Sequence, residues 1–260
     1  MKSKDGVVLR VISIASQKGG TGKTTTALNL GVCLAEKNRR TLLIDIDPQA
    51  NLTSGLGFDT YECKQTIYHI LSAQYKHPTI PCLSTQWPLL DLIPSTLDLA
   101  SVELEMASRV GREWLLKRAL ERIPGPYHYI IIDTPPSLGL LTQNAFMACR
   151  EIIVPLQVHV YALRAIPQLQ TTLNLVREFN PSLHISGIVC TMYDSRNNLS
   201  RVVEERIREQ FKEIVFKTVI PMNIAIAESP ASGKPVVDYA PISIGAKAYR
   251  QLAEEVIANG

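Results

Sequence analysis

The sequence has no apolar run that approaches the 18 residues needed to cross a bilayer, so we expect no membrane-spanning helix. Its five cysteines form no CxxC pair and no metal-ligand spacing with the five histidines. This argues against a zinc site and favours free thiols in a reducing cytoplasm. The net charge is only +3, from 27 basic and 24 acidic residues, so any nucleic-acid surface must be a local patch.

What is present indicates a globular α/β protein. Hydrophobic residues make up 46% of the 260 residues and charged residues 20%, a mixture that folds and buries a core without disulfides. Strands are predicted at 7–15, 41–46, 89–93, 129–133, 152–155, 185–192 and 217–220, and helices near 23–37, 101–122, 138–148, 162–179, 199–213 and 245–258. The alternation predicts a mostly parallel twisted sheet with helices on both faces. The stretch 59–88 is irregular and is interpreted as a loop-rich insertion.

A glycine-rich loop, SQKGGTGKTTT at residues 16–26, joins the first predicted strand to the first predicted helix. Glycines let backbone N–H groups converge on phosphate oxygens, and the helix N-terminus adds a partial positive charge. We therefore predict a P-loop NTPase fold with a nucleotide held by Lys18, Gly19, Gly20, Thr21, Gly22, Lys23, Thr24 and Thr25. Lys23 would reach the β- and γ-phosphates, and the Thr24 hydroxyl would hold Mg²⁺. The strict motif is not met, because Gln17 stands at its first glycine.

Two other predicted strands end in carboxylates. Asp133 follows the apolar run 129–132 and would support Mg²⁺, usually through water. Asp45 and Asp47 end a second run, and their spacing of two predicts that both point to the same side of the sheet. Asp47 precedes Pro48, so it also suits the role of a residue that caps a turn.

These motifs resemble those of a known family. The loop matches KGGxGKT, the deviant Walker A motif of the ParA/MinD group of P-loop ATPases. The segments DTPPSLGLL (133–141), IVPLQ (153–157), TMYDSRNNL (191–199) and KTVIP (217–221) are similar to ParA/Soj-type partition ATPases. The resemblance covers almost the whole chain. Few residues precede the first predicted strand, so we expect one P-loop ATPase domain over 1–260, without an N-terminal helix-turn-helix domain.

The resemblance implies a set of residue roles. Lys18 would cross a dimer interface and contact the phosphates of the partner's nucleotide, which makes an ATP-dependent homodimer the expected assembly. Asp45 would orient or activate the attacking water. Pro221 and Asn223 would lie at the adenine ring. The implied cofactors are ATP and Mg²⁺, and Lys18, Lys23 and Asp45 are the implied catalytic residues.

The resemblance also implies a cellular role. Such an ATPase hydrolyses ATP slowly, binds DNA without sequence preference as the ATP dimer, and acts in chromosome or plasmid segregation with a ParB-like activator. It would be cytoplasmic and associated with the nucleoid. Arg196 matches a DNA-contacting arginine of the family, although a salt bridge to Asp194 is the alternative. Met222 and Ala225 stand where similar proteins carry arginines, which counts against DNA contact at that loop.

Two alternatives within the superfamily stay open. One is a ParA-like ATPase that positions a protein cargo, and the other is a MinD-like membrane-associated ATPase. The last predicted helix has an apolar stripe formed by Tyr249, Leu252, Ala253, Val256 and Ile257. Its polar face mixes Lys and Arg with Glu, whereas a membrane-surface helix favours excess basic residues. We therefore expect this helix to dock on its own domain and expect no membrane partner.

Overall fold

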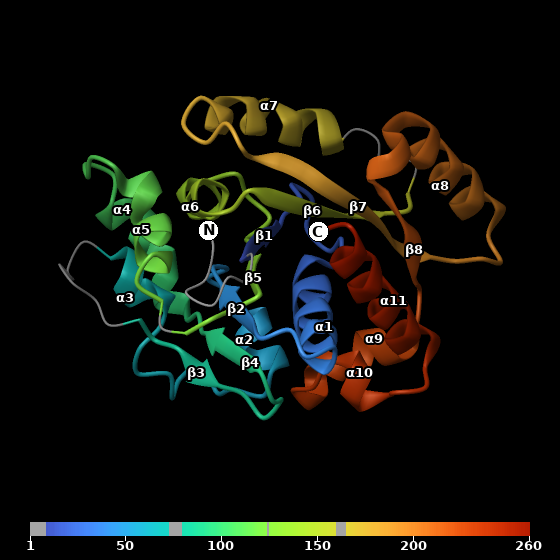
Figure 1. Cartoon of the computed structure of the whole chain (residues 1–260), viewed down its shortest axis with the longest axis horizontal. Coiled ribbons are helices and arrows are strands. Elements are labelled where there is room, and N and C mark those ends of the chain that lie inside the picture. The colour runs from blue at the N-terminus through green and yellow to red at the C-terminus, as the bar shows by residue number, and fades with distance from the viewer. Residues whose placement is uncertain (1–8, 73–79, 124, 160–164) are drawn as a thin grey trace.

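The computed structural model describes residues 9–72, 80–123, 125–159 and 165–260. These residues build one eight-stranded sheet in the order β3-β4-β2-β5-β1-β6-β7-β8 (Figure 1). The strands are β1 (Arg10–Ile14), β2 (Thr41–Asp45), β3 (Leu83–Ser84), β4 (Leu90–Ile93), β5 (Tyr129–Asp133), β6 (Glu151–Gln157), β7 (His184–Tyr193) and β8 (Val215–Pro221). Every neighbouring pair is parallel except the edge pair β3–β4. The prediction of a mostly parallel sheet is confirmed.

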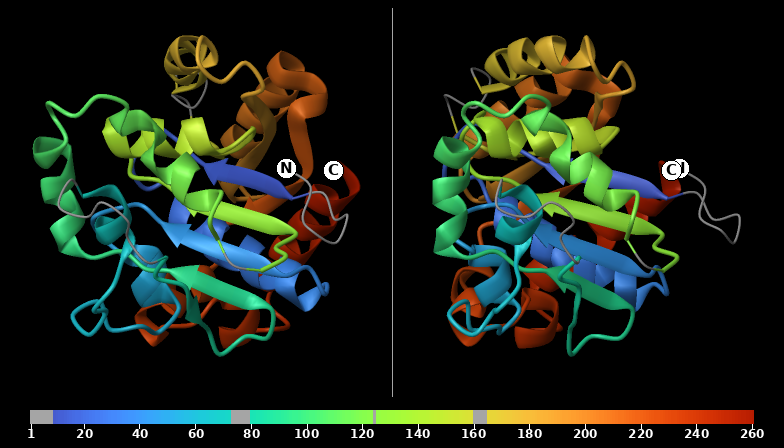
Figure 2. Two further views of the ribbon diagram at one scale, coloured as in Figure 1. Left: turned by 60° about the vertical axis from the view of Figure 1, so that its left-hand side comes forward. Right: turned by 90° about the vertical axis from the view of Figure 1, so that its left-hand side faces the viewer.

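Helices cover both faces of this sheet, as the turned views show (Figure 2). They are α1 (Lys23–Glu36), α2 (Asn51–Gly55), α3 (Ile67–Leu71), α4 (Val102–Glu105), α5 (Leu115–Leu120), α6 (Leu140–Ala148), α7 (Ala165–Arg177), α8 (Asn198–Phe211), α9 (Ile224–Glu228), α10 (Val236–Tyr239) and α11 (Ile244–Ala258). Helices α1, α10 and α11 pack on one face, and α5 and α6 pack on the other. The doubly covered sheet explains why the strands read as continuous apolar runs.

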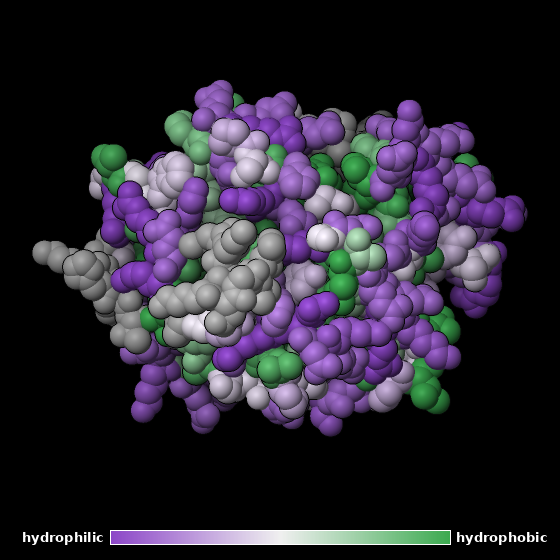
Figure 3. Space-filling model, in the orientation of Figure 1, coloured by the Kyte–Doolittle hydropathy of each residue, from purple (hydrophilic) through white to green (hydrophobic). Residues whose placement is uncertain are grey.

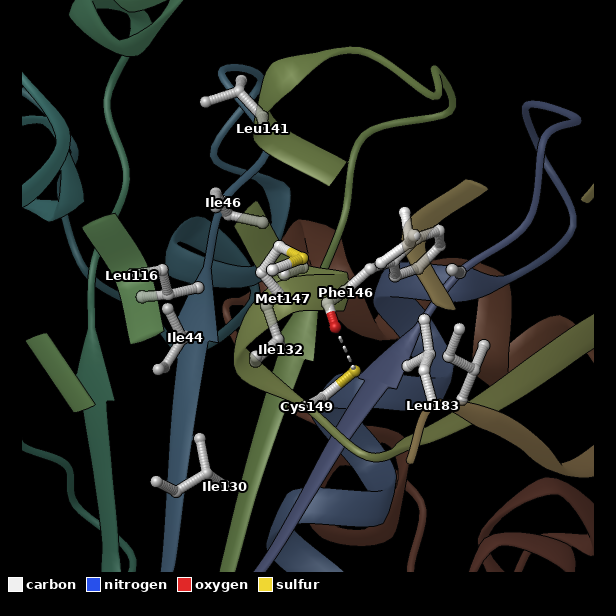
Figure 4. Close-up of a cluster of buried hydrophobic side chains, with 14 of the residues drawn as sticks. Ile44, Ile46, Leu116, Ile130, Ile132, Leu141, Phe146, Met147, Cys149 and Leu183 are labelled. Carbon is white, nitrogen blue, oxygen red and sulfur yellow. Dashed lines mark hydrogen bonds between the residues drawn. The ribbon is translucent and has the colours of Figure 1, made fainter. Parts of the chain in front are cut away.

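Strand β5 shows how the two faces are filled. Tyr129 and Ile131 pack into the core on the α1 side, whereas Ile130 and Ile132 pack into the core on the α6 side. All of β5 is buried, including its last residue, Asp133. Figure 4 shows the α6-side core, where Cys149 Sγ lies 3.9 Å from the Phe146 carbonyl oxygen. Carboxylates at the ends of these strands are therefore held in a buried, close-packed setting.

The predicted C-terminal helix docks on its own domain, as expected. Tyr249, Leu252, Ala253 and Val256 are all buried, and α11 packs against α1 and β8. Two ion pairs, Arg250 with Glu36 at 3.0 Å and Lys37 with Glu254 at 2.5 Å, tie α11 to the end of α1. In the part of the chain that the structure describes, no helix is long and apolar enough to span a membrane.

Two predicted segments differ from the structure. The single helix expected near 101–122 is broken into α4, a 3-10 turn (Arg112–Trp114) and α5. The chain leaves the helix at Met106, and Gly111, in a left-handed conformation with φ 71°, leads into the 3-10 turn. The stretch 59–88 contains α3, which begins with a capping box at Thr66, and the short strand β3. The predicted ends at 7–8 and 162–164, and residues 73–79 of the irregular stretch, lie outside the described residues.

Candidate functional site

The predicted site residues gather at the carboxyl edge of the central strands. The glycine-rich loop follows β1, and β1 lies beside β5, with Ile14 opposite Asp133. Strand β2 lies on the other side of β5, with Asp45 opposite Asp133. The sheet therefore brings the loop and both strand-end carboxylates together, although they are far apart in the sequence. This is the edge where parallel α/β sheets bind their ligands.

The loop has a backbone that its glycines make possible. Gly20 and Gly22 have φ values of 71° and 85°, a left-handed region that other residues rarely adopt. Gly22 precedes α1, so the free N–H groups of the first helical turn face the loop. The Thr191 hydroxyl donates to the Thr21 carbonyl oxygen at 2.8 Å, which fixes the loop to the end of β7. The loop is thus a concave set of donors suited to an anion.

The two loop lysines differ in their surroundings. Lys23 is buried, with Nζ 3.4 Å from the Lys18 carbonyl oxygen, and burial lowers the pKa of its ammonium group while Asp133 and Asp47 oppose that shift. Lys18 is exposed, and its Nζ lies 3.1 Å from Gln157 Oε1 at the end of β6. Lys23 therefore faces into the site, whereas the side chain of Lys18 lies on the outer surface of the loop.

Asp45 is fully buried and held by three hydrogen bonds. The backbone N–H of Asp47 donates to Oδ1 at 3.1 Å. The backbone N–H and the hydroxyl of Thr53 donate to Oδ2 at 2.9 and 2.8 Å. Burial raises the pKa of Asp45, and these donors act against that shift because they stabilise the charged form.

Asp133 is also fully buried, but its carboxylate has few hydrogen-bond partners. Within the described residues, neither of its carboxylate oxygens accepts a hydrogen bond of normal geometry. Burial raises the pKa of Asp133 well above its ordinary value, and the negative charge of Asp45 raises it further, while Thr24 and Lys23 act in the other direction. A buried carboxylate with free lone pairs beside a second carboxylate is a fitting environment for a divalent cation.

The geometry of Asp47 differs from the expectation. Strand β2 ends at Asp45, so the alternation of a strand does not extend to Asp47. Asp47 is buried, and its Oδ1 accepts a hydrogen bond from the Gln49 backbone N–H at 2.9 Å, which is the turn-capping role that the sequence left open.

A pocket of about 290 Å³ lies next to the loop. Its lining comes from the loop and α1, the ends of β7 and β8, and α9 and α11, and consists of Gly22, Thr25, Thr191, Met192, Ile220, Pro221, Met222, Asn223, Ile226, Ala227, Pro230 and Tyr249. The predicted residues Pro221 and Asn223 are thus brought to the loop. Asn223 Oδ1 is buried and has no hydrogen-bond partner in the described part of the chain. An apolar pocket with one unsatisfied amide oxygen suits a flat heterocycle that carries an N–H donor.

Arg196 lies in the loop after β7, apart from the nucleotide pocket. Its side chain is 86% exposed and pairs with Asp194, with Nε 3.0 Å from Oδ1. The end of the neighbouring strand β8 places Met222 beside Tyr193, because the Met222 N–H donates to the Tyr193 carbonyl oxygen at 2.9 Å. An exposed ion pair of this kind adds little stability. The salt bridge to Asp194 therefore does not prevent Arg196 from contacting DNA.

Sequence reasoning missed three residues of the site. Thr53 and Ser95 form a layer behind Asp45, and Gln157 holds Lys18. Thr53 lies in α2, eight residues after Asp45, and it reaches back only because Ala50 turns the chain with φ 52°. No spacing rule marks such a contact, and Ser95 follows a different strand altogether.

The Asp133 carboxylate gives a pH-dependent prediction for the protein without nucleotide or metal. Its folded-state pKa is raised above the unfolded value of about 3.9, so its charge costs nothing at pH 4 and destabilises the fold increasingly as the pH rises. Asp133→Asn is therefore expected to raise stability at pH 8 by about 1–3 kcal/mol, and to change it little at pH 4. Thermal unfolding in EDTA at both pH values measures this difference.

Asp91→Asn is the matched control for that experiment. Asp91 is also buried, but it accepts from Tyr127 at 2.7 Å and from Arg40 at 3.1 Å. Losing a paired carboxylate destabilises the fold, so this variant should melt earlier at pH 8. If Asp133→Asn also melts earlier at pH 8, Asp133 has a stabilising partner, and the interpretation that its buried charge destabilises the fold is wrong.

Known proteins similar to this chain agree with the site. Residues 9–185 match the AAA domain family. The chain is 47% identical over 252 residues to the sporulation initiation inhibitor protein Soj of Bacillus subtilis, covering 96% of this chain and 99% of that protein. It is 46% identical to the chromosome partitioning protein ParA of Caulobacter vibrioides, covering 96% and 95%.

Solved structures of similar proteins share the fold of this chain. A Mycobacterium smegmatis structure, titled cobyrinic acid a,c-diamide synthase with bound ATP analog and magnesium, has a TM-score of 0.83 and 36% identity, covering 96% of this chain and 95% of that chain. The septum site-determining protein MinD of Pyrococcus horikoshii, complexed with Mg-ADP, has a TM-score of 0.77 and 28% identity, covering 96% of each chain. With its loop, paired carboxylates and pocket in place, the chain belongs to the Soj/ParA family of P-loop ATPases.

Proposed function

We propose that this protein is a partition ATPase that binds Mg-ATP, dimerises around it, binds DNA without sequence preference as the ATP dimer, and segregates a chromosome or plasmid with a ParB-like activator. The observation that carries the proposal is the meeting of the glycine-rich loop, two buried carboxylates and an apolar pocket at one edge of the sheet. Its place of action would be the cytoplasm, on the nucleoid.

ATP would fit along the loop and pocket. The N–H groups of Gly19–Thr25 would donate to the phosphates, and Lys23 would place its ammonium group at the β- and γ-phosphates. The adenine ring would enter the pocket beside Pro221, and its amino group would donate to the unsatisfied Asn223 Oδ1. The left-handed glycines matter here because a Cβ at Gly20 or Gly22 would need a strained backbone.

Mg²⁺ would be held by the Thr24 hydroxyl and, directly or through water, by Asp133. When bound, it would offset the phosphate charge and leave the γ-phosphorus open to attack. The unsatisfied oxygens of Asp133 support this assignment, because they retain acceptor capacity that the protein itself does not use. Nucleotide and metal binding would therefore relieve the electrostatic cost of burying Asp45 and Asp133 side by side.

Asp45 would position the attacking water. Its carboxylate lies beside Asp133, on the strand next to it, and is oriented by Thr53 and Asp47. In its ionised form it would accept a hydrogen bond from the water and orient the oxygen lone pair toward the γ-phosphorus. Hydrolysis would be slow until an activator completes the site, because none of the described side chains that form it is an arginine.

Lys18 would act on the nucleotide of the second protomer. Its exposed side chain points away from its own pocket, and its ammonium group donates to the neutral amide oxygen of Gln157. Exchanging that contact for a triphosphate would stabilise the dimer, because the ammonium group would then pair with an anionic acceptor in place of a neutral one. A cation delivered across the interface would also stabilise the charge that develops on the phosphates.

DNA binding is the part of the proposal that most needs a test. Purified Asp45→Ala protein, which should hold ATP without hydrolysing it, would be titrated onto non-specific duplex DNA with ATP, ADP or no nucleotide. We expect binding only with ATP, weakening steeply with salt as counterions are released. Arg196→Ala should reduce the salt slope, whereas Arg122→Ala, an exposed residue after α5 at the amino end of β5, should not.

One observation favours a second candidate. Met222 and Ile224 are 61% and 74% exposed, and Ala225 follows them where similar proteins carry an arginine. An apolar loop suits contact with a protein better than contact with phosphates. A stable ATP dimer that fails to bind DNA at any salt concentration would overturn the DNA step and favour an ATPase that positions a protein cargo.

A further inference from the structure

The contacts behind Asp45 form a directed chain of hydrogen bonds. The Thr53 hydroxyl lies 2.8 Å from Asp45 Oδ2. The same hydroxyl oxygen lies 3.0 Å from the backbone nitrogen of Ser95, just after β4. An amide N–H can only donate, so it occupies a lone pair of the Thr53 oxygen, and the hydroxyl proton is left for Asp45. The direction of the bond to Asp45 is thereby fixed by the protein.

The chain is buried and well supported. Thr53, Ser95 and Asp45 each have no exposed surface. Ser95 is itself held, because its hydroxyl donates to the Asp47 carbonyl oxygen at 2.8 Å. Strands β2 and β4 are neighbours, so this arrangement ties α2 to the two strand ends that border the site. A hydrogen bond in such a dry environment holds its geometry closely.

Counting acceptor positions on Asp45 then shows where a water can bind. A carboxylate has about four acceptor positions, two on each oxygen. Thr53 occupies both positions of Oδ2 with its N–H and its hydroxyl, and the Asp47 N–H occupies one position of Oδ1. Among the residues that the structure describes, no other group donates to Asp45, so one acceptor position is left, on Oδ1. Because Asp45 has no exposed surface in this structure, a water would reach this remaining position only once the site forms around the nucleotide.

We infer that Thr53 is a positioning residue for ATP hydrolysis, which saturates Asp45 Oδ2 and so directs the attacking water to Oδ1. This inference rests on the proposed role of Asp45. Thr53 does not touch the nucleotide in this scheme, so its loss should slow hydrolysis and leave ATP binding intact. Misplacing an oriented reactant by a fraction of an ångström to an ångström costs about tenfold to a hundredfold in rate.

The test compares Thr53→Val and Thr53→Ala with Thr53→Ser. The first two are expected to lower kcat for ATP hydrolysis by about tenfold to a hundredfold, with KM for ATP within about threefold of the parent. Thr53→Ser keeps the hydroxyl and should retain kcat within about threefold. ATP-dependent dimerisation on a sizing column shows for each variant that it folds and binds nucleotide. Two loss variants are used because valine fills the site and alanine does not.

Thr41→Val is the matched control. Thr41 is buried at the other end of β2, and its hydroxyl donates to the Arg39 carbonyl oxygen at 2.7 Å, so the variant loses one buried hydrogen bond away from the site and should hydrolyse normally. Asp45→Asn is measured alongside. If Asp45→Asn hydrolyses at the parental rate, the proposed role of Asp45 fails. If Asp45→Asn is inactive but Thr53→Val and Thr53→Ala keep the parental kcat, or if Thr53→Ser is as slow as they are, the positioning role of Thr53 is overturned.

Discussion

Lys18→Gln is expected to abolish ATP-driven dimerisation while the monomer still binds ATP within about tenfold of the parent. The reason lies in the separation of the two lysines. Lys23 is buried against the loop, whereas Lys18 is exposed and touches only Gln157 with its ammonium group. Glutamine keeps a hydrogen-bond donor on a slightly shorter side chain but removes the charge that would pair with the partner's phosphates.

The measurement is the molar mass of the protein by light scattering on a sizing column with ATP, together with nucleotide affinity by titration. Lys37→Gln is the control, since Lys37 lies at the opposite end of α1 and pairs with Glu254. It should dimerise like the parent. A Lys18→Gln protein that still forms the ATP dimer would show that this lysine does not act across the interface.

Asp45→Ala is expected to lower hydrolysis by at least about a hundredfold and to leave an ATP dimer that persists. The variant removes the group that would orient the water but leaves the loop, Lys23 and Asp133 to hold the nucleotide. Phosphate release reports the rate, and the sizing column reports the lifetime of the dimer. Asp59→Ala, an exposed acidic residue after α2, is the control and should behave like the parent.

A dimer that dissociates as fast as the parental one would contradict the trapping, and hydrolysis at the parental rate would show that Asp45 does not position the water. Together the two variants would establish the order of steps in the proposed ATPase cycle. Lys18→Gln should stop the cycle before dimerisation, and Asp45→Ala should stop it after dimerisation.

The strands and the loop were predictable because local physics determines them. An apolar run of five residues such as 129–133 forms a strand in this setting, and Gly20 and Gly22 signal a backbone that only glycine adopts freely. The pairing of Asp45 with Asp133 was not predictable from spacing, since it depends on β5 inserting between β1 and β2 in the sheet. Strand order is a property of the whole fold.

The second layer of the site was hidden for the same reason. Thr53 reads as an ordinary helix residue, and its contact with Asp45 arises from a turn at Ala50 followed by the single-turn helix α2. The break at 106–111 was missed because the flanking segments both have helical periodicity, and the turn between them ends at a single left-handed glycine, Gly111. The roles of Lys18, Asp45 and Arg196 remain predictions until the variants above are measured.

Exposed aliphatic side chains also lie at the start of α11, close to α9. Figure 3 shows hydrophobic atoms over the loop between α10 and α11, at the lower right of the molecule. Ile242 and Ile244 in that segment are 86% and 58% exposed, and α11 contacts α9, which begins at Ile224. Any partner that binds near the pocket that contains Pro221 and Asn223 would therefore meet aliphatic side chains from two segments of the chain.

The lining of the nucleotide pocket has a consequence for how the protein is made. Gly22 and Thr25 come early in the chain, whereas Tyr249 lies in the last helix, yet all three border the same pocket. A growing polypeptide has its phosphate loop long before it has the wall formed by α11. Domains begin to fold from the N-terminal side during synthesis. In the proposed cycle, ATP would be held fully only after Tyr249 has left the ribosome, so dimers would form between finished chains and not between nascent ones.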